Sequence, residues 1–511
     1  MRLRAKRLTR KHTASKMFDL LWSAAACRPF WPKRRAKAPH SKGSQNLLMK
    51  FPAKLGVALL SLMLVFHPAF SQTPTSQPES EQLLNGLRLL LWLKPGSPDV
   101  ILKLRINSGA AFDLAGKSGE MALLGDLLFP DPATIDFFTD EMGGKLNVSV
   151  TYDSITITMV GKVAEFEQIV EVLRNALLAT QLTPETVARI RDARIKSLRD
   201  LSIAPAAVAD RAIAARLFGD FPYGRPAAGS PEDLARVDRS DLMLARERFL
   251  NSNNATLAII GGVSKARAMR SLRQLLGPWR KSEQIVPTTF RQPNPPDAKT
   301  LIVNVPGPTV EVRLAARGLS RSDTDFYVAN VMARLAQHRW QAMTPELAKQ
   351  PVFASSAAYV LPGAFVMGAA VNRQSAVDAL ASARKVIDSL MNTLATAEEL
   401  ERAKTEVINE VASALSKPEA LPDVWLDADT YRLKDPQDQI ASLRSVTASD
   451  IQRVANRLFK SAAIASVVAG ETEPLKAAMN GRVQYEVLGE MTTPSPSPKP
   501  PAKPARNINP R

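Results

Sequence analysis

Hydrophobic and polar positions along the chain predict a mixture of strands and helices from residue 83 onward. Apolar runs at 87–93 and 100–106 flank a Pro-Gly turn and predict two strands. Alternating stretches rich in β-branched residues, at 145–152 and 154–160, predict two more. The segment 163–178 has helical spacing, and one of its faces would carry Phe166, Ile169, Val170, Leu173 and Leu177. Strands and helices mixed in this way favour an α+β fold.

The second half of the chain repeats the pattern of the first. LTPETVARIRDARIKSL, from Leu182, matches ATAEELERAKTEVINEV, from Ala395, and VDRSDLMLARERFLNSNNATLAIIGG, from Val237, matches VTASDIQRVANRLFKSAAIASVVAGE, from Val446. In each copy, a helix is predicted to begin after a Thr or Ser cap with an acid three residues later. A second helix then leads into an apolar strand that ends in Gly. The chain is therefore predicted to be an internal duplication.

Polar, proline-rich stretches separate the predicted domains from each other and from both termini. The tail, with seven prolines after residue 490, is expected to be a disordered, solvated spacer. The predicted division is a basic leader at 1–48, a signal peptide at 49–71, a linker at 72–82, a first domain at 83–280, a second linker at 281–297, a second domain at 298–488 and the tail at 489–511.

The sequence MKFPAKLGVALLSLMLVFHPAFSQ, from Met49, is typical of a secretory signal peptide. It has a basic start, an apolar run and a small-residue site that predicts cleavage before Gln72. The apolar run is about a dozen residues, short of the roughly twenty that a membrane-spanning helix needs, so a retained anchor is the weaker interpretation. Because a signal peptide begins near the true N-terminus, Met49 is the predicted initiator. We expect an exported protein, located in the bacterial periplasm.

The net charge of +18 is concentrated outside the predicted domains. The first 48 residues contribute +12, residues 49–71 contribute +2 and the segment from residue 491 contributes +4, which leaves the remainder close to zero. An electrically balanced body lacks the basic surface that nucleic-acid binding requires. We therefore expect no nucleic-acid partner.

Few side chains of the mature chain could hold a catalytic zinc ion. Of the four histidines, His12, His40 and His67 precede the predicted cleavage site, and only His338 follows it. The single cysteine, Cys27, lies in the leader. One imidazole and no thiol cannot supply the nitrogen or sulfur ligands of an ordinary catalytic zinc site. We expect no metal and no cofactor, and we interpret His338 as structural because no second catalytic residue can be assigned to it.

Five segments in the same order, together with the duplication, carry a resemblance that covers residues 85 to about 490. They are NGLRLLLWLKP, AGKSGEMALLGDLLFPDP, EMGGKLNVSVTYDSITITM, FGDFPYGRPAAGSPEDLARVDRSDL and NNATLAIIGGV. In these segments the chain resembles the M16, or insulinase-type, peptidases. The resemblance implies two duplicated α+β domains, each an antiparallel-rich sheet with helices packed mainly on one face.

Active M16 peptidases carry HxxEH on a helix, in which two histidines bind zinc and the glutamate acts as general base. By resemblance, this motif falls on the five residues from Ala122, so that Ala122, Gly125 and Asp126 stand where the His, Glu and His are expected. The third ligand, a later glutamate, falls near Ser197. The resemblance thus implies that the zinc ligands and the general base have been lost.

Two further segments match parts that active relatives use on the substrate. An Arg and a Tyr seven residues apart hold substrate in those relatives, and Glu346 and Phe353 align with them. Gly143, Gly144 and Asn147 lie where relatives place a strand beside the catalytic helix, so any peptide-binding edge is expected there. The alternative for these three residues is a plain hairpin turn and strand.

The resemblance implies a non-catalytic subunit that is not an enzyme on its own. It would pair with an active, zinc-bearing M16 subunit in an extracytoplasmic peptide-degrading complex and help to hold unfolded peptide, with no membrane span after signal cleavage. One alternative is a stand-alone binding or scaffold protein of the cell envelope, since core subunits of respiratory complexes share this fold. The other is an active hydrolase with a relocated site.

Overall fold

The computed structural model describes residues 77–489, except 203, 344–346, 348–349, 418–419 and 434–438. The side chains of residues 200–202 are also outside the description. The predicted leader, the signal peptide and nearly all of the tail therefore lie outside the described residues.

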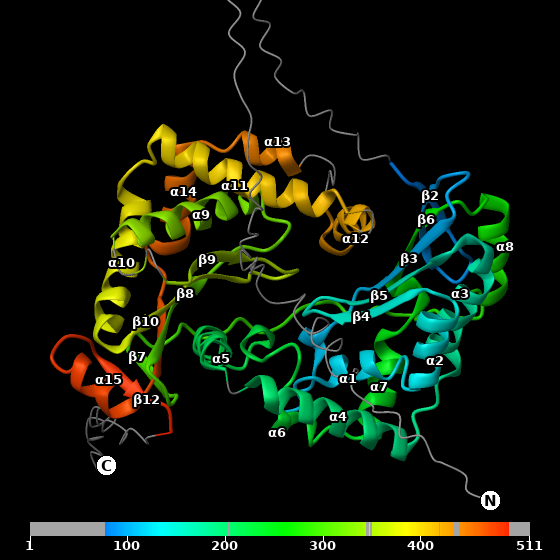
Figure 1. Ribbon diagram of the computed structural model, residues 1–511, viewed down its shortest axis with the longest axis horizontal. Helices are drawn as coiled ribbons and strands as arrows, with labels where there is room; N and C mark the ends of the chain where they lie inside the picture. Colours follow the sequence, from blue (N-terminus) through cyan, green and yellow to red (C-terminus); the bar gives the residue numbers. More distant parts are fainter. Residues whose placement is uncertain are drawn as a thin grey trace, which may run out of the picture. The chain divides into compact units, whose positions relative to one another are not determined.

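The first half of the chain forms a mixed six-stranded sheet with the order β1-β2-β6-β3-β5-β4 (Figure 1). β2 and β6 are parallel, and all other neighbours are antiparallel. The strands are β1 (Glu79–Gln82), β2 (Arg88–Leu93), β3 (Asp99–Ile106), β4 (Lys145–Val150), β5 (Ile155–Lys162) and β6 (Ala255–Gly261). The four strands expected in this half are present, with ends shifted by one or two residues.

The second half forms another six-stranded sheet, with the order β12-β7-β11-β8-β10-β9. Its strands are β7 (Thr300–Asn304), β8 (Thr309–Arg317), β9 (Val352–Ala357), β10 (Ala364–Asn372), β11 (Ala465–Gly470) and β12 (Tyr485–Val487). The order β7-β11-β8-β10-β9 repeats β2-β6-β3-β5-β4, and the parallel pair β7 and β11 matches β2 and β6. The α+β class and the duplication are thus confirmed.

Helices of the first half cover one face of its sheet and build the first hydrophobic core. The apolar face predicted at 163–178 is buried as expected, and its residues lie on α3 and on the π turn that follows it. The helices of this half are α1 (Glu120–Asp126), α2 (Pro132–Asp136), α3 (Phe166–Arg174), α4 (Pro184–Ser202), α5 (Pro205–Phe218), α6 (Pro231–Leu234), α7 (Arg239–Phe249) and α8 (Lys265–Leu275).

Short 3₁₀ and π segments connect these elements. The 3₁₀ turns of the first half are Ala110–Phe112, Val163–Glu165, Pro222–Gly224 and Ser252–Asn254, and the π turns are Phe137–Glu141 and Asn175–Ala179. The second half has a 3₁₀ turn at Arg373–Ser375.

The second half repeats this layering around its own core. Its helices are α9 (Phe326–Met343), α10 (Ala376–Asn392), α11 (Ala397–Leu415), α12 (Leu421–Tyr431), α13 (Gln439–Arg444), α14 (Ala448–Phe459) and α15 (Thr472–Met479). The predicted caps are observed as capping boxes at α11, from Thr396, and at α14, from Thr447. At α7 the cap is Asp238, which replaces the expected Ser or Thr and serves the same purpose with its carboxylate.

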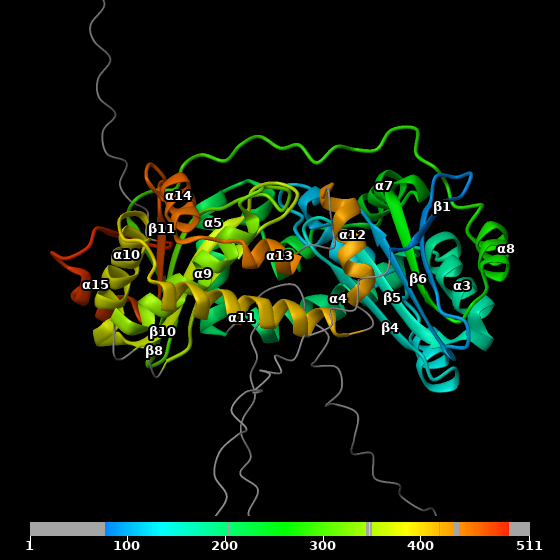
Figure 2. The same cartoon turned by 90° about the horizontal axis from the view of Figure 1, so that it is seen from above.

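One helix from each half packs against the opposite face of the other half's sheet (Figure 2). α5 buries Ala209, Ile213 and Leu217 against β8 and β11 of the second sheet. α12 buries Leu426 beside Leu90, Trp92 and Ile260 of the first sheet. Each sheet is therefore covered on one face by its own helices and on the other by a helix exchanged between the halves. The duplication predicts the layers but not this exchange.

The segments expected to be linkers differ in structure. Glu79–Gln82, part of the predicted linker 72–82, forms β1 and pairs with β2. Polar side chains are tolerated there because an edge strand needs only its backbone to pair. Residues 281–299 contain no helix or strand. Within the described part of the chain, every helix is too short or too polar to cross a bilayer.

Candidate functional site

The helix at the position of the zinc motif, α1, begins at a carboxylate cap from the preceding loop. Asp113 accepts hydrogen bonds from the backbone N–H groups of Gly119 (2.7 Å) and Met121 (2.8 Å). Burial raises the pKa of Asp113 to about 7. Met121, Leu123 and Leu124 of α1 are part of the first core. Ala122 is also buried, at 2% exposed.

The last turn of α1 is closed by packing and by an ion pair. A Cβ at Gly125 would lie 2.8 Å from Cγ2 of Val150 on β4, so even one methyl group would crowd this position. Asp126 is paired with Arg194 of α4, at 2.7 Å between Oδ2 and a guanidinium nitrogen. Arg194 also donates to the carbonyl of Ala228. The carboxylate at the position where the resemblance places the second histidine is thus already neutralised by a cation.

Ser197, expected near the third ligand position, lies one turn beyond Arg194 on the same helix. Its side chain is half-buried. In the described residues, no group of three or more His, Cys, Asp or Glu side chains is arranged to hold a metal ion. The proposed loss of zinc ligands stays a prediction, which these positions make testable.

Gly143 and Gly144 immediately precede β4, an edge strand of the first sheet, and Asn147 lies within it. Gly143 has a left-handed φ of 62° with open space around it, which suits a turn. A Cβ at Gly144 would lie 2.7 Å from the ring of Phe138 and 2.9 Å from the carbonyl of Val160. Both glycines therefore have structural reasons to be there, while Asn147 lies on a strand whose outer edge is unpaired within the described sheet.

The second sheet has an equivalent edge strand, β9, which carries Phe353. Phe353 pairs in register with Gly368, which pairs with Arg313 on β8. Arg313 lies over the Phe353 ring, 5.1 Å from its centroid, and Gly368 leaves the room that this contact needs. Glu346, which the sequence analysis paired with Phe353, lies outside the described residues.

The two rows of residues correspond across the duplication. In the first sheet, Asn147 pairs with Thr158, which pairs with Lys103. In the second sheet the same three strand positions hold Phe353, Gly368 and Arg313. The residues that sequence reasoning selected separately, Asn147 and Phe353, therefore occupy matching places on the two edge strands.

Carboxylates of the exchanged helices neutralise the buried cations of these rows, and sequence reasoning missed them. Lys103 binds Asp423 of α12 at 2.7 Å, and Arg105 binds Asp427 at 2.5 Å. In the second sheet, Arg313 binds Asp210 of α5 at 2.6 Å. A buried basic residue inside an otherwise apolar strand is a signal that a carboxylate partner exists, although it does not say where.

His338 is part of a helix–helix contact. Its Nε2 lies 2.9 Å from Glu406 of α11, and that carboxylate is also 3.3 Å from Arg402. Burial lowers the pKa of His338, and Glu406 opposes this effect. Sequence reasoning expected a structural histidine, and this position between α9 and α11 agrees with that interpretation.

Comparison with known proteins gives a match to one family model. The model described as "Peptidase M16 inactive domain" matches residues 236–407. The match begins just after α6 and ends within α11. Over these residues the chain is similar to the M16 peptidases. The family resemblance expected from the sequence is thereby confirmed.

Solved structures share the fold of this chain. A protease from Helicobacter pylori matches with a TM-score of 0.70 at 16% identity, covering 77% of this chain and 100% of that one. A peptidase M16 inactive domain from Pseudomonas fluorescens gives 0.68 at 17%, covering 77% and 98%. A chain of complex III2 from Candida albicans gives 0.66 at 15%, covering 79% and 99%. No curated protein matches the sequence.

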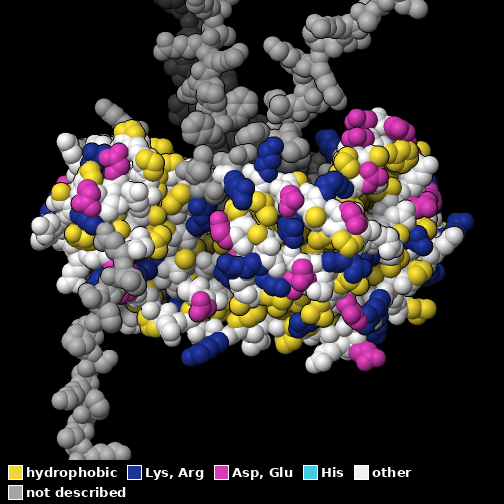
Figure 3. All heavy atoms as spheres, turned by 90° about the horizontal axis from the view of Figure 1, so that it is seen from below, with side chains coloured by type: hydrophobic (Ala, Val, Ile, Leu, Met, Phe, Trp, Pro, Cys, Tyr) yellow, Lys and Arg dark blue, Asp and Glu magenta, His cyan; other side chains and the backbone are white. Residues whose placement is uncertain are grey.

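Acidic and basic side chains are interspersed on the face of the protein that Figure 3 shows. Many of them form ion pairs at short range, as between Arg267 and Glu167. This pairing agrees with the near-neutral charge calculated for the body of the chain.

A buried carboxylate links the two halves of the protein. Asp153, in the turn between β4 and β5, is 3% exposed. It accepts hydrogen bonds from the Tyr223 hydroxyl (3.5 Å), from the backbone N–H of Val360 (3.1 Å) and from Tyr431. Burial raises its pKa to about 6, the hydrogen bonds oppose the rise, and Asp427 adds to it.

We expect the ionisation of Asp153 to make the protein less stable as the pH rises. The folded state holds the Asp153 proton more tightly than the unfolded state does. The contribution of Asp153 to the free energy of unfolding is therefore fully present below the unfolded pKa of 3.8, and it is lost as the pH rises through about 6. The loss is about 2–3 kcal/mol for a shift of this size. Urea unfolding from pH 4 to pH 7 measures it, and Asp153→Asn should remove that part of the slope.

The matched control is Asp192→Asn on α4, where the carboxylate is 71% exposed. It should leave the pH slope of the free energy of unfolding unchanged. Equal slopes for the native protein and Asp153→Asn would contradict this account of the junction.

Proposed function

We propose that this M16 protein is a non-catalytic subunit that pairs with an active, zinc-bearing M16 peptidase in an extracytoplasmic peptide-degrading complex. The observation that carries the proposal is the end of α1. There Gly125 packs against Val150, and Asp126 is neutralised by Arg194. A zinc site needs His, Cys or carboxylate ligands that are free to bind the metal, whereas this carboxylate already has a cationic partner.

The match to the M16 inactive domain model supports the non-catalytic role. The histidine and cysteine inventory supports it too, because His338 is the only histidine after the predicted cleavage site and it contacts Glu406. The signal peptide predicted at 49–71 supports export. These observations are independent of one another.

Peptide binding is proposed at the edge strands. β4 and β9 end their sheets, and each exposes a row of backbone groups that an extended peptide could pair with. Asn147 and Phe353 stand at matching places on these strands. The subunit would contribute such an edge to peptide that its partner cleaves.

Affinity purification of the tagged chain from its native cells tests the partner role. We expect a second M16 chain with an intact HxxEH motif to co-elute in about equal amounts, and the complex to hydrolyse unstructured peptides. As a matched control, the tagged partner purified alone should retain its zinc but cleave less peptide. Purification of the tagged chain without any M16 partner would contradict the proposal.

The likeness to a chain of complex III2 favours a second candidate, a scaffold protein of the cell envelope. That complex is a multi-subunit assembly, and the likeness is one of fold. A scaffold would co-elute with proteins that lack HxxEH, or would remain a monomer or homodimer. The same purification therefore separates the two candidates.

A further inference from the structure

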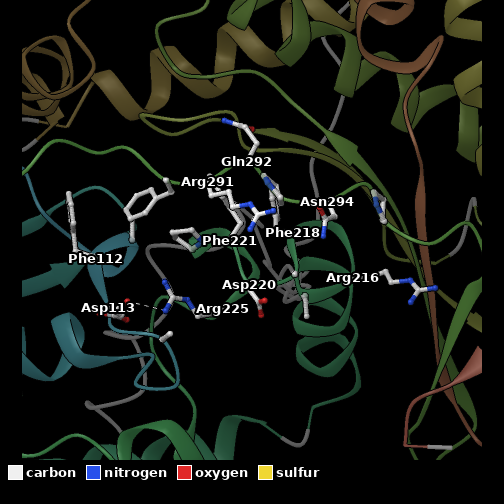
Figure 4. Close-up of a pocket in the computed structure, with 18 of the residues that line it drawn as sticks. Phe112, Asp113, Arg216, Phe218, Asp220, Phe221, Arg225, Arg291, Gln292 and Asn294 are labelled. Atoms are coloured by element: carbon white, nitrogen blue, oxygen red, sulfur yellow. Dashed lines mark hydrogen bonds between the residues drawn. The ribbon is translucent and has the colours of Figure 1, made fainter. Parts of the chain in front are cut away.

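A cavity of about 970 Å³ lies under the segment that connects the two halves (Figure 4). Most of residues 286–297 form one wall, and α5 with the loop that precedes α1 forms another. The proposed function does not use this cavity. Its occupant can be inferred from its lining and from the place at which the described chain ends.

The cavity has an aromatic side. Phe290, from the connecting segment, lies 5.8 Å from the ring of Phe112 and 6.1 Å from that of Phe221. Phe112 and Phe290 are only half-buried, so they leave ring surface for a ligand. Half-exposed aromatic rings in a groove are what proline-rich segments in the polyproline II conformation dock against.

The cavity is also bordered by the guanidinium groups of Arg216, Arg225, Arg248 and Arg291. The Arg225 guanidinium is fixed by the carbonyls of Asp113 and Leu114, as Figure 4 shows on the Asp113 side. A polyproline II segment has no internal hydrogen bonds and presents every carbonyl to its surroundings, so its carbonyls can accept from guanidinium N–H groups that reach the cavity.

The described chain ends at the cavity. Leu488, after the last strand, lines it and is 61% exposed. Beyond it, the sequence TTPSPSPKPPAKPARNINPR includes seven prolines, and the first of them, Pro494, lies six residues after Leu488. Six residues span up to about 20 Å, so the prolines can reach the cavity.

We propose that the C-terminal tail, residues 491–511, binds in this cavity as a polyproline II segment of the same chain. The cavity lining carries both charges, and one of its carboxylates is available to a basic segment. Asp220 lines the cavity and makes no ion pair with a described residue, while Lys499 and Lys503 lie within the proline-rich run. The tether raises the local concentration of the tail to the millimolar range, so weak contacts suffice. The inference does not depend on the proposed function.

Disulfide trapping in the full chain tests the proposal. Replacement of Cys27 by Ser leaves no native thiol, so Ala115→Cys in the cavity wall and Ser497→Cys in the tail form the only pair. We expect this intramolecular disulfide to form at least about tenfold faster than that of a control pair, Glu473→Cys with Ser497→Cys, because docking raises the local thiol concentration. Glu473 is 81% exposed on α15, which packs against β7 near the tail's origin.

Two changes to the trapping pair sharpen the result. Alanine at Pro494, Pro496 and Pro498 cannot disturb the folded body, and it should slow trapping to the control rate. Asp220→Lys should slow it by a smaller factor. Equal rates for the two thiol pairs would overturn the proposal, as would disulfides that form only between two chains, which would mean that the cavity takes the tail of a second copy.

Discussion

Replacing Arg313 by Met should lower the free energy of unfolding by about 3–5 kcal/mol, because it leaves a buried carboxylate without its cation. The Arg313 side chain is fully buried, and it binds Glu311 at 2.8 Å and Asp210 of the exchanged helix α5 at 2.6 Å. Glu311 is only 10% exposed, so it would keep a charge that neither water nor a cation stabilises. Urea unfolding followed by circular dichroism measures the loss.

Two matched variants separate this effect from a general loss of packing. Arg334→Met removes an ion pair with Glu410 in which the arginine is 22% exposed and the acid 55%, and it should cost no more than about 1 kcal/mol. Arg313→Met combined with Glu311→Leu should recover at least half of the loss, because an apolar pair needs no counter-charge. A double variant as unstable as Arg313→Met would contradict the explanation.

Replacing Leu426 by Ala should cost about 2–5 kcal/mol, the range for removing a buried leucine from a packed core. Leu426 is fully buried on α12 among Leu90, Trp92 and Ile260. It anchors the exchanged helix to the first sheet, so limited proteolysis should also cut the chain faster around α12. Thermal and urea unfolding provide the free energy, and digestion followed by mass spectrometry locates the cuts.

Leu394→Ala is the matched control, because that leucine is 51% exposed. Its expected effect is within about 0.5 kcal/mol, as for most surface substitutions. If Leu426→Ala were equally mild, the exchanged helix would not be held by its apolar contact, and the ion pairs to Asp423 and Asp427 would have to account for its position.

Local patterns in the sequence predicted much of the fold, since they depend on neighbours along the chain. The apolar face of α3 was visible because Phe166, Ile169 and Val170 recur at helical spacing, and all three are buried. The helix caps at Thr396 and Thr447 were visible because each has an acid three residues later. The repeat of these signals at a separation of about 210 residues then predicted two equivalent domains.

The exchange of α5 and α12 could not be predicted from these patterns. An amphipathic helix shows which of its faces is apolar, but not which sheet that face covers. Lys103, Arg105 and Arg313 indicated that carboxylate partners were needed, and those partners are more than 100 residues away in the sequence. Likewise, the contact between Gly125 and Val150 joins a helix to a strand that follows it, and it becomes visible only when both are in place.

The sequence predicted individual residues of the candidate site but not the contacts between them, because these contacts join elements that are distant along the chain. Sequence reasoning found Asn147 and Phe353 by separate resemblances, whereas the register of the two sheets shows that they are equivalent. It did not find Arg194, because the ion pair with Asp126 joins α1 to α4 across 68 residues.

The central claim is that this chain alone neither holds a catalytic zinc ion nor cleaves peptides. The most direct test uses the isolated chain from Gln72, the predicted cleavage site, onward. This protein is dialysed against zinc and then freed of excess metal. Elemental analysis and a fluorogenic peptide assay on the same sample should find far less than one zinc per chain and no cleavage above the buffer rate. One tightly bound zinc per chain together with cleavage by the isolated chain would contradict the account, and would support the hydrolase with a relocated site.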